Sequence, residues 1–284
     1  MTGITAAGQL QYESRVRPRQ AIIAGAAGVL LIGSAAVQLA GAHTNVAEIT
    51  LGLILEKKRY GLDVAGAVVQ AGGWLAVAWT LWFLFSATRA RDAAAPRYIR
   101  YIALVGAPLA AIGISGYIIG YGIQANHFTG AQTYPEANHL MSAPLLAVFQ
   151  VMDYGGELLL AVSFVLVSMQ AMRVGLLTRF MGYLGIIAGI LVLFVVTPVP
   201  IVQAYWLVAL GVLFADRWPS GTPPAWQTGR VERWPSSQEL REQRQRQQSG
   251  GGRGKQAPKA AAATQEAPNS TRATTPKRKR KRRK

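Results

Sequence analysis

The sequence contains no cysteine and only three histidines among its 284 residues. The absence of cysteine excludes disulfide bonds, thiolate zinc sites, iron–sulfur clusters and covalently attached c-type haem. A bound metal would therefore need histidine and carboxylate ligands. Charged residues are also scarce, at 15% of the chain against 51% hydrophobic residues. This balance lies outside that of soluble domains and predicts a protein that crosses a membrane several times.

Several motifs of catalysis are missing as well. The chain has no G-x-S-x-G nucleophile turn, no P-loop and no dinucleotide-binding glycine fingerprint. The glycine-rich "GGGRG" at 250–254 follows no predicted strand, so it is not expected to bind phosphate. We therefore assign no catalytic residue and no cofactor. An enzyme activity is left open only through the acidic face described below.

The apolar residues form blocks close to membrane-spanning length, which is about 20 residues for a helix. Six blocks are predicted to be transmembrane helices: 21–42, 64–87, 101–123, 143–172, 181–196 and 201–215. The predicted fold class is thus all-α, a polytopic membrane helix bundle of about six transmembrane helices over residues 21–215. Because "TPVP" joins the last two blocks, a re-entrant hairpin is the alternative to two full crossings.

Lysine and arginine in the short connections predict the orientation, because positively charged loops stay in the cytoplasm. Arginines occur in alternate connections, namely 1–20, 88–100 and 173–180. Two connections on the other side, 124–142 and 197–200, contain neither lysine nor arginine. These counts place both termini in the cytoplasm, with residues 1–20 as a cytoplasmic N-terminal segment.

The connection before the second span is an exception to this pattern. It carries Lys57, Lys58 and Arg59 on the side that is otherwise free of cations. Asn45, with Glu48 three residues later, matches a helix-capping pattern. We therefore expect a short interfacial helix ahead of the second span.

Most of the positive charge follows the last predicted span. Residues 216–284 hold 18 of the 30 lysines and arginines, so the net charge of +17 belongs mainly to this region. Residues 216–248 place Trp218, Trp226 and Trp234 beside prolines and arginines, which predicts a juxtamembrane collar at the lipid headgroups and then a short polar helix. Residues 249–284 lack core-forming residues and are predicted to be a disordered tail.

The tail closes with eight consecutive cations: Lys277, Arg278, Lys279, Arg280, Lys281, Arg282, Arg283 and Lys284. A flexible run of this kind is expected to bind anionic phospholipid or the phosphates of a nucleic acid. The alternative is a solvated tail that only fixes the orientation. The expected partners are therefore the lipid bilayer and an anionic lipid or nucleic acid, and homo-oligomerisation stays open.

Glycines recur at the same spacing in two predicted spans: Gly113, Gly116 and Gly120 in the third, and Gly182, Gly185 and Gly189 in the fifth. Small residues at such spacing let helix backbones approach closely in a membrane. Since the two spans should run parallel, we expect them to contact each other. A chance match in a chain rich in glycine and alanine is the alternative.

Four polar residues share one face of the fourth span: Gln150, Asp153, Tyr154 and Glu157. We call this set the acidic face. Counting from Arg173 at the cytoplasmic boundary places Asp153 near the outer edge of the hydrocarbon and Glu157 about one turn inside it. Carboxylates there are expected to face the bundle interior or water, and their mutual repulsion favours one of them keeping its proton.

All three histidines are predicted to lie on the outer side, where they could join the acidic face in one vestibule. They are His43, His127 and His139, with Glu136 between the last two. Such groups could bind a divalent metal or sense pH. No two histidines have helical i, i+4 spacing, however, and hydrogen bonding of the carboxylates to neighbouring groups, without a ligand, is the other interpretation.

The segment "LLTRFMGYLGIIAGILVL", the proline-containing hairpin and "RWPSGTPPAWQTGRVERWPSSQE" resemble multi-pass bacterial membrane proteins, including a family defined only as a domain of unknown function. The resemblance covers mainly residues 176–239. It implies a location in the bacterial cytoplasmic membrane and provides no catalytic residues.

Two functions are consistent with these patterns. The first is transport, sensing or binding of a small solute or ion at an outward-facing site on the fourth span. The second is a membrane-anchored interaction protein whose basic tail recruits an anionic partner. Dependence on pH or cations would indicate the first, and binding by the tail alone would indicate the second.

Overall fold

The computed structural model describes residues 6–39, 48–194, 200–219 and 221–232, together with 241, 242 and 245. The chain divides into two units, Met1–Trp234 and Pro235–Lys284. Only three residues of the second unit are described, so every helix named below belongs to the first. The predicted disordered tail, Trp234 and the eight terminal cations all lie outside the described residues.

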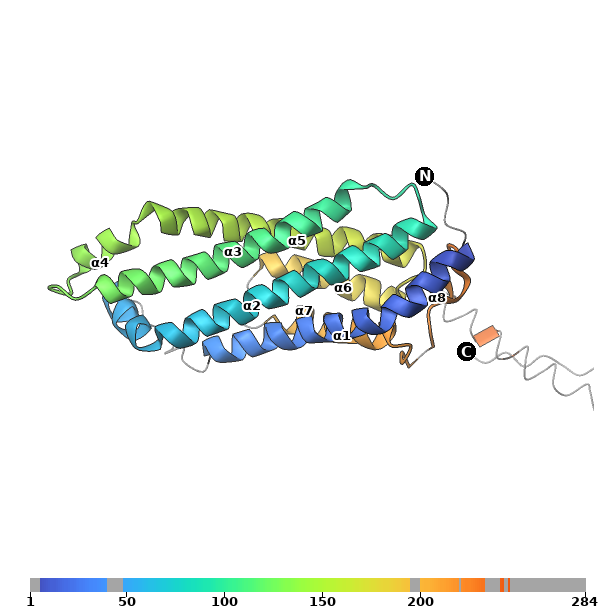
Figure 1. Ribbon diagram of the computed structural model, residues 1–284, viewed down its shortest axis with the longest axis horizontal. Coiled ribbons are helices and arrows are strands. Elements are labelled where there is room, and N and C mark those ends of the chain that lie inside the picture. The colour runs from blue at the N-terminus through green and yellow to red at the C-terminus, as the bar shows by residue number, and fades with distance from the viewer. Residues whose placement is uncertain are drawn as a thin grey trace, which may run out of the picture. The chain divides into compact units, whose positions relative to one another are not determined.

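The described residues form helices joined by short connections, with no strand among them (Figure 1). The helices are α1 (Ala6–Leu39), α2 (Ile49–Arg91), α3 (Tyr98–His127), α4 (Tyr134–Met141), α5 (Pro144–Arg173), α6 (Arg179–Leu193), α7 (Ile201–Phe214) and α8 (Pro224–Thr228). The prediction of an all-α fold is therefore confirmed for this part of the chain.

Four helices of the described chain, α1, α2, α3 and α5, are long and apolar enough to cross a membrane. The remaining apolar helices, α6 and α7, are shorter, with 15 and 14 residues. The prediction of a separate interfacial helix before the second span is wrong. Residues 49–61 instead form the first turns of a continuous α2 of 43 residues.

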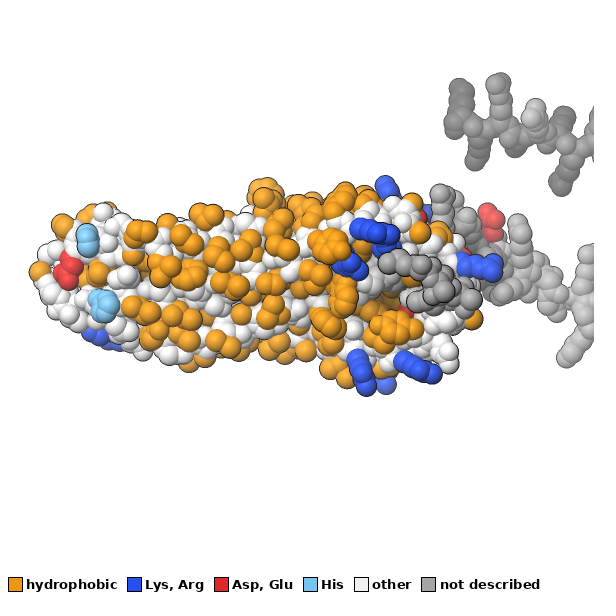
Figure 2. Space-filling model, turned by 45° about the horizontal axis from the view of Figure 1, so that its top comes forward, with side chains coloured by type: hydrophobic (Ala, Val, Ile, Leu, Met, Phe, Trp, Pro, Cys, Tyr) orange, Lys and Arg blue, Asp and Glu red, His pale blue; other side chains and the backbone are white. Residues whose placement is uncertain are grey.

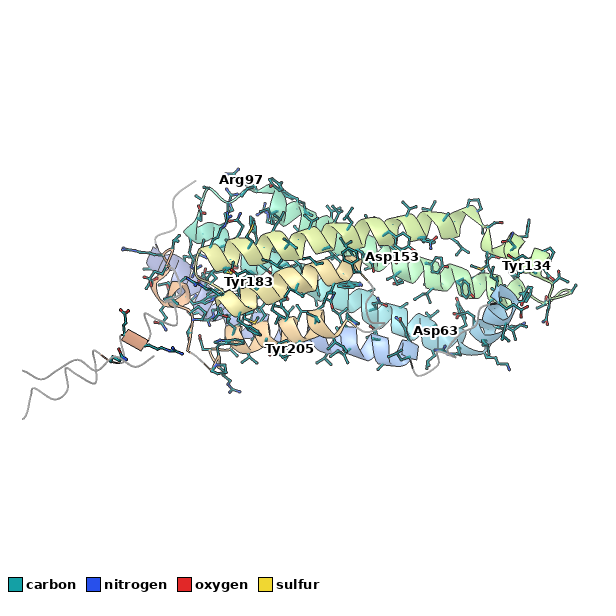
Figure 3. The ribbon with its side chains drawn as sticks, turned by 180° about the vertical axis from the view of Figure 1, so that it is seen from behind. Asp63, Arg97, Tyr134, Asp153, Tyr183 and Tyr205 are labelled. Atoms are coloured by element: carbon teal, nitrogen blue, oxygen red, sulfur yellow. The ribbon has the colours of Figure 1, made fainter. Side chains whose placement is uncertain are left out.

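The helices are arranged as a ring in which each packs on the next: α1, α2, α3, α5, α6, α7 and again α1. This ring is complete at the arginine-rich end, where α1 begins and α5 ends. The α6–α7 hairpin extends only part of the way along the bundle (Figures 1 and 3). Beyond the hairpin, α1, α2, α3 and α5 continue as an open arc. No described helix occupies the places that α6 and α7 have in the ring.

Two buried polar contacts hold the hairpin together. Trp206 Nε1 of α7 donates to the Met181 carbonyl at 2.9 Å, and Gln203 Nε2 donates to the Ala188 carbonyl at 3.1 Å. Trp206 is fully buried and its ring packs edge-on against Phe164 of α5. Buried donors that find acceptors stabilise a fixed geometry, so α6 and α7 form one rigid element.

Both glycine sets pack on α5. Gly113, Gly116 and Gly120 face Asp153, Phe149 and Leu146, whereas Gly182, Gly185 and Gly189 face Met172, Ser168 and Ala161. The expected direct contact between the two sets is wrong, because α5 is the neighbour of both. Small residues permit close approach but do not specify which helix approaches.

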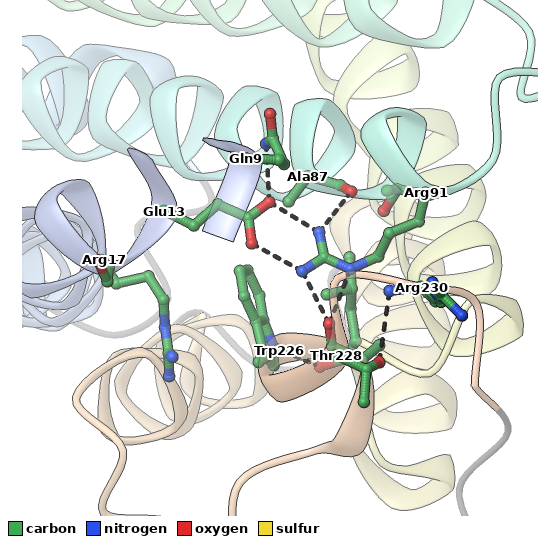
Figure 4. A network of polar contacts seen from close by, with 12 residues as sticks. Gln9, Glu13, Arg17, Ala87, Arg91, Trp226, Thr228 and Arg230 are labelled. Atoms are coloured by element: carbon green, nitrogen blue, oxygen red, sulfur yellow. Dashed lines mark hydrogen bonds and ion pairs between the residues drawn. The ribbon is translucent and has the colours of Figure 1, made fainter. Parts of the chain in front are cut away.

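The arginine-rich end is closed by a buried ion pair between α1 and α2 (Figure 4). Arg91 makes a bidentate contact with Glu13, with both N–O distances 2.7 Å, and the two side chains are 0% and 2% exposed. The remaining Arg91 donors reach the carbonyls of Ala87 and Ala225. Every N–H of the guanidinium thus has an acceptor, which a buried charge requires.

Trp226 of α8 lies inside this network. It is 4% exposed, donates from Nε1 to the Leu176 carbonyl at 2.9 Å, and has the guanidinium groups of Arg17 and Arg91 over its ring at 4.8 and 5.1 Å. The expectation that Trp226 lies at the lipid headgroups is therefore wrong. Arg17 also forms an ion pair with Asp216, which fixes the chain leading to α8.

The segment after α8 returns to the end of α5. Glu232 N donates to the Val174 carbonyl at 3.3 Å, and the backbone there touches Gly175, which has a φ of 81°. A side chain at Gly175 would meet the Glu232 carbonyl. Glycine is required at this position by both the left-handed backbone and the contact.

We predict that Arg91→Met lowers thermal stability markedly, because Glu13 would remain buried without its partner, a loss of about 3–5 kcal/mol. The double variant Glu13→Leu/Arg91→Met should recover much of this loss, since neither charge remains. Thermal unfolding in one detergent measures both, with exposed Arg97→Met as the control. Equal melting temperatures for Arg91→Met and Arg97→Met would contradict this role of the ion pair.

Candidate functional site

The acidic face continues the side of α5 that packs on α6. Ala161, Phe164 and Ser168 of α5 contact glycines of α6. Glu157 is one turn before Ala161 on the same helical face, and Tyr154 and Gln150 are one and two turns before Glu157. Glu157, Tyr154 and Gln150 therefore occupy the stretch of α5 that a longer α6 would cover, whereas Asp153 packs against Gly113 of α3 at the edge of this stretch.

The level at which α6 ends follows from the contacts of its last glycine. Gly189 packs on Ala161 and Phe164, and the two helices run antiparallel. Leu193, one turn further along α6, is consequently at the level of Glu157. Figure 3 shows Asp153 beside the end of the hairpin. The acidic face begins where α6 stops.

Neither carboxylate of this face receives a hydrogen bond from any residue that the structure describes. Asp153 and Glu157 are both partly buried, whereas Tyr154 is 61% exposed. One hydrogen bond lies within the set, from Gln150 Nε2 to the Tyr154 hydroxyl at 3.2 Å. Two partly buried carboxylates one turn apart thus lack hydrogen-bond donors among the described residues, which makes their charged forms costly.

The backbone beneath the acidic face is held against α3. A Cβ on Gly113 would collide with the backbone nitrogen of Asp153, and a Cβ on Gly156 would collide with that of Ala110. The two backbones therefore touch at Asp153 and at Gly156, within the turn that carries both carboxylates. This packing fixes the position of the carboxylates, as a preorganised binding site requires.

The two histidines of the described chain do not join this site. His127 ends α3 and His139 lies in α4, and both are exposed. Glu136 accepts hydrogen bonds from the backbone N–H groups of Gly130 and Gln132, at 3.3 and 3.0 Å, so it stabilises the connection between α3 and α4. Asp153 is about 14 Å further along α5 from the start of that helix, at 1.5 Å per residue.

His43 lies outside the described residues. Among residues that the structure describes, no three histidine, aspartate or glutamate side chains come close enough to hold a metal ion. The acidic face is therefore a pair of carboxylates with an amide and a phenol beside it. Oxygen groups of this kind suit protons, hard cations or an organic ammonium group.

Arg59, which precedes the predicted second span, forms an ion pair that the sequence patterns did not indicate. Arg59 Nη2 donates to Asp63 Oδ1 at 3.1 Å and to the Gln38 carbonyl of α1 at 3.4 Å. Asp63 is 9% exposed. The i, i+4 spacing of Arg59 and Asp63 is the signal that could have revealed it, because both residues lie in the continuous helix α2.

No protein-family model matches the chain, and no curated protein or solved structure matches it either.

We predict that Gly156→Ala destabilises the protein, by about 1–3 kcal/mol, because the added methyl group would force α5 away from Ala110. Gly72→Ala is the matched control: it is also a helical glycine, and nothing lies within 4 Å of the position that an added Cβ would take. That change should be neutral or stabilising by up to about 1 kcal/mol. Thermal unfolding of the two variants would contradict the close α3–α5 contact if Gly156→Ala were the more stable.

Proposed function

We propose that the chain is an integral membrane protein of the bacterial cytoplasmic membrane, with α1, α2, α3 and α5 crossing and α6–α7 entering as a re-entrant hairpin. At 1.5 Å per residue α6 and α7 are about 22 and 21 Å long, below the roughly 30 Å of a hydrocarbon core. The bacterial location rests on the resemblance of residues 176–239, and the cytoplasmic position of the termini rests on the arginine pattern.

The surface supports a membrane location. Figure 2 shows hydrophobic side chains along one face of the bundle, between an end rich in lysine and arginine and an end that carries histidine. Exposed apolar side chains occur on every long helix, including Ile22, Val68, Ile112 and Val151. Such a continuous apolar band exceeds what a soluble monomer exposes.

We infer that the acidic face binds a small cation or cationic solute, as the binding step of transport or sensing. The observation that carries this proposal is the pair of carboxylates without hydrogen-bond donors, within the described chain, on a rigid segment of α5. A cation at this place would offset the negative charge of Asp153 and Glu157, and Tyr154 or Gln150 would add a neutral oxygen ligand. The end of the hairpin lies at the same level, so displacement of the α6–α7 hairpin would change access to the bound cation.

The basic tail supports a second role, because the sequence after the last apolar helix includes eight adjacent cations. At about 1 kcal/mol per residue near an anionic surface, they would hold the tail at the membrane. This role and cation binding are compatible.

We predict that one of sodium, calcium or ethylammonium raises the melting temperature of the full-length protein in detergent at pH 8. The effect should be smaller at pH 5, because protons compete for the carboxylates. Glu157→Gln should fold and lose the cation effect, since it keeps the shape of the side chain but cannot ionise. Glu48→Gln is the control, because Glu48 is exposed and makes no side-chain cap. An undiminished cation shift in Glu157→Gln would contradict the proposed site.

The topology gives a further prediction, for which the absence of cysteine is an advantage. A single cysteine at Thr129, in the exposed connection after α3, should react with an impermeant thiol reagent in intact cells. A single cysteine at Ala93, in the exposed connection after α2, should react only after permeabilisation. The reverse pattern would contradict cytoplasmic termini.

A further inference from the structure

A second candidate binding site lies between α1 and α2 at the arginine-rich end. It is a cleft of about 320 Å³, within the range of small-ligand sites. Its lining comes from two helices only: Gln9, Tyr12, Glu13, Val16 and Gln20 of α1, and Trp79, Trp82, Phe83, Ser86 and Ala87 of α2. The cleft is therefore an intrinsic feature of the α1–α2 pair and is separate from the acidic face.

The lining combines aromatic walls with uncharged polar groups. Trp79 and Trp82 pack edge-on at 5.0 Å between ring centres. Glu13 is the one acidic residue of the lining, and its charge is already balanced by Arg91, while Gln9 donates a further hydrogen bond to it at 2.8 Å. A cation would therefore find no free carboxylate here, unlike at the acidic face.

Two buried polar atoms on lining residues lack hydrogen-bond partners in the described chain. They are Gln20 Oε1, an acceptor, and Trp82 Nε1, a donor. Gln20 is only 5% exposed. A buried unsatisfied group is costly, so a ligand that offered one acceptor and one donor between α1 and α2 would recover this energy.

The surroundings of the cleft change from basic to apolar along the bundle. Arg15 and Arg19 are exposed on α1, three and seven residues after Tyr12, and so lie along the same side of the helix. Further along, Ile22 of α1 and Leu75 of α2 are 73% and 49% exposed. A ligand that fits these surroundings has an anionic group, uncharged polar groups on either side of it, and a hydrocarbon part.

We propose that the cleft binds one anionic glycerophospholipid of the surrounding bilayer. Its phosphate contacts Arg15 and Arg19, an ester carbonyl accepts from Trp82 Nε1, a headgroup hydroxyl donates to Gln20 Oε1, and the acyl chains follow Ile22 and Leu75. Phosphatidylglycerol has all of these groups. This proposal depends on the membrane location and is independent of cation binding at Asp153 and Glu157.

The test is a native mass spectrometric titration of the full-length protein with phosphatidylglycerol and with phosphatidylcholine. All arms use a background in which the cations of 277–284 are replaced by glutamine, so that the tail does not contribute. We expect one tightly held phosphatidylglycerol per chain and weaker binding of phosphatidylcholine. Glycerol 3-phosphate should not compete, because it lacks the acyl chains.

Three variants locate the lipid. Arg15→Gln/Arg19→Gln should weaken phosphatidylglycerol binding at least about fivefold, and Trp82→Phe and Gln20→Leu should each weaken it about fivefold by removing a hydrogen bond. The matched control is Arg173→Gln/Arg179→Gln, which removes the same charge from exposed positions of α5 and α6 at the same end. Equal losses in the two double variants, or wild-type affinity in both Trp82→Phe and Gln20→Leu, would overturn the proposal.

Discussion

The unequal lengths of the helices in the ring determine where the bundle can bury apolar surface and where it must present polar groups. Each apolar helix buries its surface by packing on its neighbours. Helices α6 and α7 pack on α5 and α1 only near the arginine-rich end, because α6 ends at Leu193 and α7 begins at Ile201. On that side α5 presents Ala161, Phe164 and Ser168 to glycines of α6. Past that point the same face of α5 carries polar residues, because it has no described helix to pack on. The residues on this face of α5 thus change from apolar to polar at the level where α6 ends.

The two ends of the bundle solve the problem of buried charge differently. At the arginine-rich end, Arg91 and Glu13 are fully paired and enclosed by Trp226, so that charge contributes to a unique geometry. At the acidic face, Asp153 and Glu157 have a fixed backbone and no donor within the described chain. The first arrangement is complete without a ligand, whereas we propose that a cation completes the second. This contrast is the main reason for assigning binding to α5 rather than to the buried ion pair.

Much of the fold and the composition of the acidic face could be predicted from sequence. The contacts between helices, and the neighbours of each side chain, could not. Hydrophobic block length located the four long helices, and helical periodicity placed Gln150, Asp153, Tyr154 and Glu157 on one face. Periodicity does not reveal which neighbouring helix a face contacts. The equal spacing of the two glycine sets therefore predicts that they contact each other, whereas both contact α5. The preference of indole side chains for the membrane–water interface predicts that Trp226 lies at the lipid headgroups. Its burial between Arg17 and Arg91 depends on contacts between residues far apart in the chain, which this preference does not reveal. The relation of the histidines to α5 likewise depends on a loop path that spacing does not determine.

Cation binding on α5 requires that water and hydrophilic cations reach the acidic face past the end of the hairpin. The most direct measurement compares the reaction rates of single cysteines at Tyr154 and Val148 with a cationic, membrane-impermeant thiol reagent. Both residues are exposed on α5, but Val148 lies on a different side of the helix and about 9 Å nearer its start. We predict that the cysteine at 154 reacts faster although it lies deeper. A faster reaction at 148, or no reaction at 154, would contradict access of cations to the acidic face.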